Sequence, residues 1–499
     1  MNNKKSAPFQ KATGLKSFSR SVILLLLVGC SFFLVQCKKE STTTSSSAKL
    51  AFSANLLFFD TVFTTVGSTD RVFVVHNNNS QAVVVSNISL KGLWPTYYKI
   101  NVDGVAGSNF NNIKIPANDS IYVFATVTVD PQNTNNPAVI RDSLVFTTNG
   151  NLQSVALVAF GWNAYFYVPN TFPPSGVAYY EVPCGSEWKN DKPHVVFGYL
   201  HVPTGCSLTI DAGCQVYLHD SAVIFVDSDA TLNVNGKAGA GNQVTFQGDR
   251  LEPDYKYLPG QWNSIVLYKS TNCNISWAVI QNGQVGIQVD TLANGGTGLK
   301  MDHTIIKSMS EYGLFGAGTN ITADDCLIAD CQNSCLYLWI GGTYIFNQCT
   351  FADYWGVYNG YSQRSSPLLY INNYYESATS QIIQRPIHKA YFGNCIIYGA
   401  LNEELKLDSL PGYPADSFKF FFQNCLIKTQ QSTTSGYHYS GNYLNLDPGF
   451  NDVPLDLYLV ANPGPAIGVG NPNIAVNYTL TLDDEFRNPT QANLGAYEQ

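Results

Sequence analysis

The N-terminal part of the chain alternates short apolar runs with polar turns. The runs are rich in Val, Ile, Phe and Tyr: "RVFVVHN" (71–77), "AVVVSNISL" (82–90), "DSIYVFATVTVDP" (119–131), "DSLVFTTN" (142–149) and "SVALVAFGW" (154–162). Asn, Gly and Asp residues separate the runs, at the spacing of a β-sandwich. We therefore predict a β-sandwich over residues 49–165, held by its apolar core alone because it contains no cysteine.

The second half of the chain repeats a short motif, which consists of a polar pair, a small residue and largely apolar residues. It occurs as "ADDCLI" (323–328), "FNQCTF" (346–351), "FGNCII" (392–397) and "FQNCLIK" (422–428). In register, the small residue recurs after 26, 22, 23, 46 and 30 residues, at Ala278, Thr304, Cys326, Cys349, Cys395 and Cys425. A period of this length that tolerates insertions is typical of a solenoid, and no helical stripe accompanies it. We therefore predict a parallel β-helix over residues 195–447.

The repeated small residue has a physical explanation in a β-helix. Equivalent residues of successive coils stack about 4.8 Å apart, so these six residues should form one inward column at a tight corner. The Asn or Asp before it suits a turn, where its side chain can bond the next backbone group. Export would permit disulfides, but parallel stacked side chains stay too far apart at Cβ. We expect mostly buried thiols, with Cys331 and Cys335 as the best candidates for an exception.

The first 37 residues have the pattern of an export signal. Basic residues precede the apolar run "SVILLLLVGCSFFLV" (21–35), which is shorter than the roughly 20 residues that span a bilayer. Cys37 and a polar tether over 38–48 follow. This order resembles the lipoprotein signals of Gram-negative bacteria, in which a cysteine becomes the lipidated first residue. We favour Cys37 as that residue, and Cys30 in "LVGC" is the alternative.

Two further resemblances concern the folded part. "LLFFDTVFTTVGSTDRVFVVHN" (56–77) and "IPANDSIYVFATVTVDP" (115–131) resemble the immunoglobulin-like N-terminal domain of bacterial surface lipoproteins. The stretches 198–249 and 259–289 resemble the first coils of right-handed parallel β-helix proteins of the polysaccharide-lyase-like superfamily, and the first of them alternates inward hydrophobic residues with Gly-led turns. Together these resemblances imply an all-β chain: an N-terminal β-sandwich, then a right-handed parallel β-helix with a C-terminal cap.

Two regions complete the predicted domain order. The Pro- and aromatic-rich segment 166–194 should act as a linker. After residue 447 the period is lost, and the segment 448–499, which ends in "LGAYEQ", resembles the C-terminal segment that closes many such β-helices. Asn493 stands where that ending usually has Asp. A cap would shield the strand edges that the end of a solenoid exposes.

Composition narrows the classes of function. Charged residues make up only 13 % of the chain, which suits an extracytoplasmic β-protein. The formal net charge of −8 argues against a nucleic-acid partner, which would require a basic face. The seven histidines form no ligand-like pair, so the sequence predicts no metal site and no cofactor.

The sequence predicts no catalytic residue. Asp302 and Asp324 are roughly equivalent in adjacent coils, and Asp325 follows, so these residues are candidates for a catalytic carboxylate pair. The same position continues as Asn347, Gly393 and Gln423, which is typical of a ladder of turns. The acidic stretch "LNEELKLD" (401–408) is typical of a solvated loop.

The stretch 337–375 is crowded with tyrosine and tryptophan around Arg364, and Arg385 and His388 follow it. Aromatic rings beside an arginine could stack on sugars and bind an acidic group. This interpretation predicts a ligand-contact set of Trp355, Tyr358, Tyr361 and Arg364. The alternative is a large loop packed against the β-helix by its own aromatic residues.

These observations favour a lipid-anchored protein of the outer membrane, displayed at the cell surface. Its partners would be the membrane, through the anchor, and a polysaccharide or another surface protein, bound without turnover. One alternative is a lyase, hydrolase or epimerase that acts on an acidic polysaccharide. The other is a purely structural envelope protein.

Overall fold

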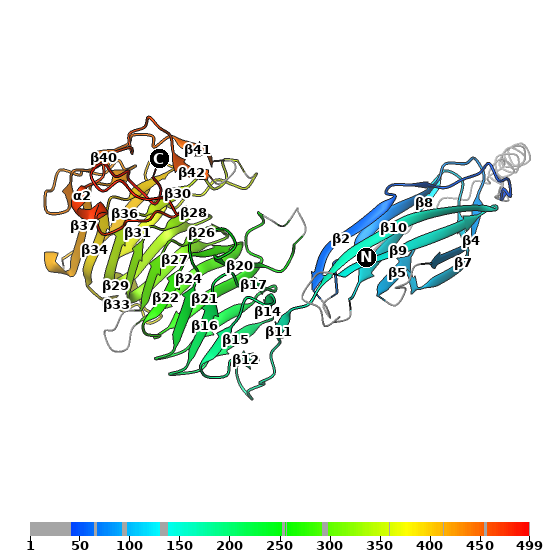
Figure 1. Cartoon of the computed structure of the whole chain (residues 1–499), viewed down its shortest axis with the longest axis horizontal. Coiled ribbons are helices and arrows are strands. Elements are labelled where there is room, and N and C mark those ends of the chain that lie inside the picture. The colour runs from blue at the N-terminus through cyan, green and yellow to red at the C-terminus, as the bar shows by residue number, and fades with distance from the viewer. Residues whose placement is uncertain are drawn as a thin grey trace, which may run out of the picture. The chain divides into compact units, whose positions relative to one another are not determined.

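The computed structural model describes residues 41–63, 67–91, 97–129, 138–251, 255, 257–291, 298–358, 360–412, 414–453 and 457–498. The described chain is mostly β-strand, and its internal contacts divide it into two compact units (Figure 1). The predicted export signal, with Cys30 and Cys37, lies outside the described residues. Among the helices of the described part, none is long and apolar enough to cross a membrane.

The N-terminal unit is a β-sandwich of two five-stranded sheets. One sheet has the order β1 (Ala51–Phe52), β3 (Arg71–Asn77), β8 (Asp119–Val127), β5 (Tyr98–Val102) and β6 (Val105–Gly107). The other has the order β2 (Leu56–Phe63), β10 (Asn151–Trp162), β9 (Ala138–Thr148), β4 (Val83–Leu90) and β7 (Asn109–Ile115). Alternate residues of β8 are buried, as the period of a strand with one covered face requires. The predicted sandwich is present, and its relation to immunoglobulin-like domains stays a prediction.

The second unit contains a parallel β-helix. Strands of neighbouring coils pair in parallel and in register. Examples are β15 (Tyr199–Val202) with β18 (Val223–Val226), and β26 (Ile305–Met309) with β28 (Leu327–Cys331). Figure 1 shows these coils stacked along one axis. The all-β class and the parallel β-helix that the sequence predicted are therefore confirmed.

The strands of the β-helix lie on three faces. The first face contains β12 (Tyr179–Glu181), β15 (Tyr199–Val202), β18 (Val223–Val226), β21 (Trp262–Tyr268), β24 (Gly283–Asp290), β27 (Tyr312–Asp324), β29 (Ser334–Asn347), β31 (Leu369–Asn372) and β36 (Leu405–Asp408). The second contains β13 (Ser186–Trp188), β16 (Ser207–Asp211), β19 (Thr231–Asn235), β22 (Cys273–Ser276), β25 (Leu299–Asp302), the later parts of β27 and β29, β34 (Ile387–Gly393), β37 (Phe418–Gln423) and β39 (Tyr439–Ser440).

The third face contains β11 (Tyr165–Tyr167), β14 (His194–Val196), β17 (Gln215–Leu218), β20 (Val244–Gly248), β23 (Ala278–Gln281), β26 (Ile305–Met309), β28 (Leu327–Cys331), β30 (Thr350–Asp353), β35 (Ile396–Gly399), β38 (Leu426–Ile427) and β40 (Tyr443–Leu444). Outside the faces lie the hairpin of β32 (Tyr374–Glu376) and β33 (Ile382–Gln384), the pair β41 (Phe450–Asp452) and β42 (Leu457–Val460), the 3-10 turn η2 (Ala415–Ser417) and the short helix α2 (Pro472–Ala475). One apolar core runs through the coils from Val182 to Ile427.

The segment 166–194 is part of the β-helix, so the prediction of a linker was wrong. Strand β11 pairs with β14, and β12 pairs with β15, both in parallel. The segment therefore supplies most of a first coil. Its prolines and aromatic residues obscure the strand pattern because the three strands within it are only three residues long.

The six small residues of the repeat form one buried inward column, as predicted. All are at most 1 % exposed, and each directly precedes or begins a strand of the third face. Their hydroxyl or thiol groups also donate to backbone carbonyls of the preceding coil: Thr304 to Ile275, Cys349 to Ala323 and Cys395 to Phe346. A small side chain with a weak donor thus fills the corner and satisfies an inner carbonyl.

The residue before each member of this column has a left-handed backbone. Its φ lies between 44° and 53° in six positions: Trp277, His303, Asp325, Gln348, Asn394 and Asn424. This conformation is costly for residues other than glycine and is best tolerated by Asn and Asp. The polar residue of the repeat therefore marks the corner at which the chain turns into the third face.

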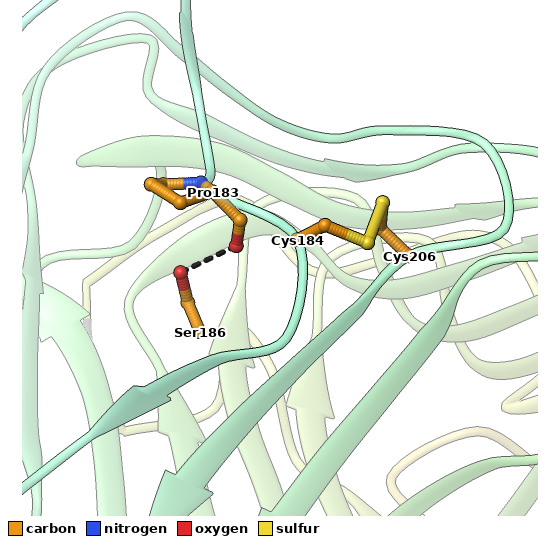
Figure 2. Close-up of a disulfide and its surroundings, with 4 residues drawn as sticks. All are labelled: Pro183, Cys184, Ser186 and Cys206. Carbon is orange, nitrogen blue, oxygen red and sulfur yellow. Dashed lines mark hydrogen bonds between the residues drawn. A yellow bond between two sulfur atoms is a disulfide. The ribbon is translucent and has the colours of Figure 1, made fainter.

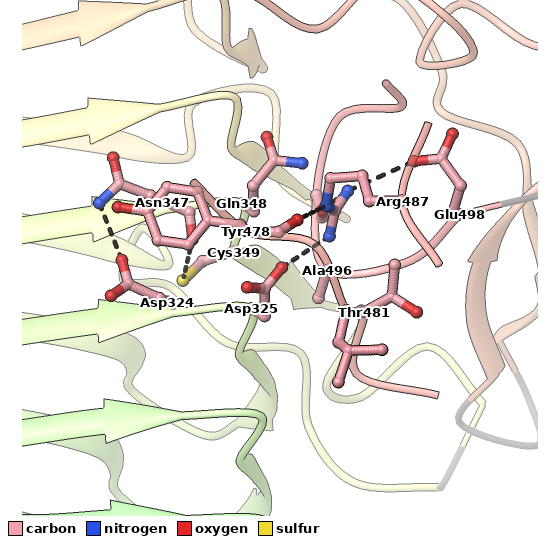
Figure 3. A network of polar contacts seen from close by, with 12 residues as sticks. Asp324, Asp325, Asn347, Gln348, Cys349, Tyr478, Thr481, Arg487, Ala496 and Glu498 are labelled. Atoms are coloured by element: carbon pink, nitrogen blue, oxygen red, sulfur yellow. Dashed lines mark hydrogen bonds and ion pairs between the residues drawn. The ribbon is translucent and has the colours of Figure 1, made fainter. Parts of the chain in front are cut away.

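The C-terminal segment lies along these corners and reaches further back than the last coil. Asn471 exchanges two hydrogen bonds with Asn394, at 2.7 and 3.1 Å, and its side chain donates to Asn424. Arg487 donates to Asp325 at 2.6 Å and lies 3.5 Å from Glu498 (Figure 3). The corner side chains were expected to bond the next backbone group of their own turn. Those of Asp325, Asn394 and Asn424 instead hold the C-terminal segment.

Cysteine pairing differs from the expectation at one site. Cys184 and Cys206 form a disulfide (Figure 2), whereas Cys331 and Cys335 are buried free thiols. The paired cysteines lie in turns between strands, where side chains on neighbouring coils need not point the same way; their Cα atoms are 4.9 Å apart. The other eight cysteines from Cys184 onward are free, and burial raises the pKa of Cys326 and Cys395 well above the usual range.

We predict that mass spectrometry of the protein, denatured without reductant in the presence of an alkylating agent, will show one linked pair of peptides, Cys184 with Cys206. The remaining cysteines from Cys214 onward should carry the alkyl group, because they are held as separate buried thiols in the native state. A disulfide-linked peptide that contains Cys331 and Cys335 would contradict this pairing.

Candidate functional site

The loop after β30 packs around a buried arginine. The Arg364 side chain has no exposed surface; its Nε lies 3.2 Å from Asp353, and Nη2 pairs with Glu404. Burial raises the pKa of Asp353 to about 7, against the opposing effect of the Arg364 charge. Arg364 also donates to the Ser366 carbonyl at 2.6 Å. The guanidinium therefore anchors the loop to the β-helix from inside.

This arrangement corrects the predicted contact set. Arg364 is inaccessible, and Trp355 is only 3 % exposed and stacks on Tyr361 with ring centroids 5.0 Å apart. Tyr358 and Tyr361 do reach solvent. The sequence predicted Arg364 as a ligand contact, whereas Asp353 and Glu404 pair with it inside the protein. The stretch 401–408 is likewise not a solvated loop, because Glu404 is fully buried and β36 lies within it.

The acidic residues of the repeat serve the turns and the C-terminal segment. Asp302 and Asp324 are paired in register, and the position continues through Asn347, Gly393 and Gln423, as predicted for a ladder. Asn347 donates to Asp324 at 2.8 Å. Burial raises the pKa of Asp324 to about 6.

Asp325 holds Arg487 (Figure 3), and burial raises its pKa to about 7 despite that neighbouring positive charge. Asn347 thus binds Asp324, and Arg487 binds Asp325, within the protein.

Another part of the stretch 337–375, together with β27, forms a continuous surface on the first face and on the hairpin strand β32. Six aromatic residues on β27, β29, β31 and β32, which we call the aromatic strip, are half-buried: Tyr312, Phe315, Tyr337, Trp339, Tyr370 and Tyr375. Successive ring centroids lie 4.6 to 6.0 Å apart. The strip exists because Phe315, Tyr337 and Tyr370 are equivalent residues of consecutive coils, all pointing away from the core.

The rings of the strip have two orientations. Phe315, Tyr337 and Tyr370 stack nearly parallel, at 6° and 13°. Trp339 is tilted by 50° to Phe315 and by 55° to Tyr375, so neither ring stacks on it. The stacked rings give the strip a rigid apolar base, and the tilted indole leaves part of its face for a ligand.

Polar groups border one end of the strip. Lys406 places its ammonium 5.0 Å from the centre of the Tyr370 ring. Asp408 accepts hydrogen bonds from the hydroxyls of Tyr370, at 2.8 Å, and Tyr374, at 3.0 Å. The Tyr337 hydroxyl, like that of an ordinary tyrosine, is a protonated donor at neutral pH, and burial raises its pKa further, to about 12. The strip thus combines apolar rings with fixed donors and acceptors.

Sequence reasoning singled out Tyr337, Trp339, Tyr370 and Tyr375 as part of a crowd but did not separate them from the loop. It missed Tyr312 and Phe315. The repeat held the necessary signal, because Phe315 lies 11 residues before Cys326 and Tyr337 lies 12 before Cys349.

Among the described residues, no group of three or more His, Cys, Asp or Glu side chains is arranged to hold a metal ion.

Comparison with known proteins does not identify the chain. No family and no curated protein matches it. A solved α-1,3-glucanase catalytic unit of Streptomyces thermodiastaticus is 12 % identical over 74 % of this chain and 67 % of its own, with a TM-score of 0.23. A protein of unknown function from Porphyromonas gingivalis W83 is 12 % identical over 26 % of this chain and 50 % of its own, with a TM-score of 0.18.

A third similar structure is a family 123 glycoside hydrolase of Clostridium perfringens, 12 % identical over 23 % of this chain and 27 % of its own, with a TM-score of 0.18. The aligned part thus spans half or less of the Porphyromonas and Clostridium chains. At these TM-scores the similarities carry no argument about function. The strand pairings of this chain establish its fold.

We predict that Arg364→Gln will destabilise the β-helix without acting at a ligand site. Removing one partner of a buried ion pair leaves uncompensated charge, which costs about 3–5 kcal/mol. Chemical unfolding should show that loss. Lys419→Gln is the matched control, because Lys419 pairs with Asp416 on the surface and its removal should change stability little. An Arg364→Gln protein as stable as the wild type would contradict the anchoring role.

Proposed function

We propose that this protein binds a polysaccharide along the first face of its β-helix without cleaving it. The aromatic strip carries this proposal. It offers a row of apolar ring surfaces, repeated once per coil, with hydrogen-bonding groups at Tyr370, Tyr374 and Asp408. Sugars have an apolar face of C–H groups and a polar rim of hydroxyls, so a chain of them suits such a surface.

Binding without turnover is supported by where the acidic residues lie. Hydrolysis of a glycosidic bond needs two carboxyl groups that flank the bond. Asp353 and Glu404 are enclosed with Arg364, and Asp325 is enclosed with Arg487. Asp408, at the strip itself, accepts from two tyrosines. These four carboxylates thus make structural contacts within the protein.

We further propose that the protein is tethered to the outer membrane and displayed at the cell surface. The N-terminal sequence supports this proposal through its basic start, its short apolar run and the polar tether after Cys37. A surface position would give the strip access to polysaccharides outside the cell. The sandwich would then lie between the anchor and the β-helix in the order of the chain.

Substitution of the strip should weaken binding. For a polysaccharide selected on a glycan array, Trp339→Ala and Tyr337→Ala should each reduce the affinity about two- to tenfold, since an aromatic contact contributes about 0.5–1.5 kcal/mol beyond burial. Titration calorimetry would measure the change. Tyr437→Ala removes a 91 % exposed tyrosine elsewhere and is the control. Tyr358→Ala distinguishes the strip from the loop after β30, and it should not alter the affinity.

Unchanged affinity in both strip variants would contradict the strip as the binding surface. The same polysaccharide, incubated with the wild-type protein, should release neither reducing ends nor unsaturated products. Release of either would overturn the proposal that binding occurs without turnover.

Lipidation can be tested in cells. Radiolabelled palmitate should be incorporated into the wild-type protein, and Cys37→Ser should abolish the label, because the thiol at that position would carry the lipid. Persistent labelling of Cys37→Ser would move the anchor to Cys30. No label in the wild-type protein would contradict the lipid anchor.

A further inference from the structure

A cleft of about 340 Å³ opens at the corner between the first and second faces. It adjoins the aromatic strip, since Ile340, which lines it, follows Trp339 in β29. The rest of the lining comes from β27, β29 and the start of β34: Gly318, Asn320, Gly342, Thr343, Arg385, Pro386 and His388. The described residues of the lining supply a guanidinium, an imidazole, an amide and a hydroxyl, but no carboxylate. In a chain with a net charge of −8, this cleft is thus lined by a positive charge, that of the Arg385 guanidinium.

Arg385 differs from the other arginines of this unit. Arg364 and Arg487 are buried in ion pairs, and Arg250 lies over the Tyr255 ring at 3.6 Å. Arg385 is exposed, and among the described residues its side chain has no hydrogen-bond, ion-pair or ring partner. Its backbone is nevertheless fixed, because its N–H donates to the Asn373 carbonyl at 2.9 Å. A guanidinium on a fixed backbone with unused donors is suited to bidentate binding of an anion.

The backbone of the corner makes room for this arginine. Gly341 has φ +88°, and a Cβ there would lie 2.9 Å from the Cβ of Arg385. Gly342 has φ +122°, and a Cβ there would lie 2.3 Å from the Thr319 carbonyl oxygen. The pairing of β29 with β34 shifts at this point, so His388 is an extra residue between Ile387 and Lys389. Such bulges redirect side chains, and here the bulge exposes His388 beside the cleft.

We propose that this cleft binds the carboxylate or sulfate group of an acidic polysaccharide whose sugar rings lie on the aromatic strip. The proposal rests on the function proposed above and deepens it, because it names the class of polysaccharide. Arg385 supplies paired N–H donors, and His388, Asn320 and Thr343 supply further polar contacts around the anion. Trp339, one residue from the lining, joins the anion site to the strip.

The test compares charged and neutral forms of the same polymers. Oligogalacturonate is compared with its methyl ester, and sulfated dextran with unmodified dextran, by titration calorimetry on the full-length protein. The wild-type protein should bind at least one charged form about tenfold more tightly than its neutral partner, since a hydrogen bond to a charged group is stronger than one to a neutral group. Oligogalacturonate and sulfated dextran distinguish a carboxylate from a sulfate ligand.

Arg385→Gln should abolish this preference and leave the affinity for the neutral form unchanged. Lys300→Gln removes an exposed positive charge from β25 on the second face and is the matched control, which should keep the preference. Equal affinity of the wild-type protein for charged and neutral forms, or a preference that survives in Arg385→Gln, would overturn the anion site. In either case, weaker binding of the neutral form by Trp339→Ala would leave the proposed polysaccharide function standing. No binding of any polymer would overturn both.

Discussion

The structure depends on one constraint, which is the left-handed corner that turns the chain into the third face in the coils from Ala278 to Cys425. At six successive coils the chain adopts φ near +50° directly before a fully buried small residue. The corner fixes where each coil turns, and therefore which residues of the next strand face the core. Because coils stack in register, an error of one residue would turn the apolar side chains outward. The inner Thr and Cys residues stabilise the corner through donors to the preceding coil.

The same corner explains how the C-terminal segment is held. A left-handed residue directs its side chain away from the core, so Asp325, Asn394 and Asn424 are available to a second layer. In the segment after residue 447, Asn471 forms hydrogen bonds with Asn394 and Asn424. The Arg487 side chain is fully buried between Asp325 and Glu498. On the first face, the in-register pairing of strands also aligns outward side chains. Equivalent outward positions bring Phe315, Tyr337 and Tyr370 into one ladder, on which the proposed binding surface rests.

The fold class, the coil register and the ladder of turns could be predicted from the sequence because they repeat. Cys326, Cys349, Cys395 and Cys425 recur in the same short motif at intervals of 23, 46 and 30 residues, and this repetition reveals which residues are equivalent. Features that occur once could not be found this way. The partners of Arg364 come from two other segments, and nothing near residue 364 in the sequence indicates that Glu404 will enclose it. The first coil was missed because its strands are very short, and the Cys184–Cys206 pair because both residues lie in turns.

The candidate site, too, could be predicted only in part from the sequence. Tyrosine and tryptophan content indicated an aromatic surface, but only the strand pairing separates the strip from the loop that buries Trp355.

The central claim, that a polysaccharide lies along the strip, is tested most directly by hydroxyl-radical footprinting with and without the bound polymer. Oxidation of Trp339, Tyr337 and Tyr370 should fall on binding, while that of Tyr358 and Tyr437 stays unchanged. Protection of Tyr358 with no change at Trp339 would contradict the account.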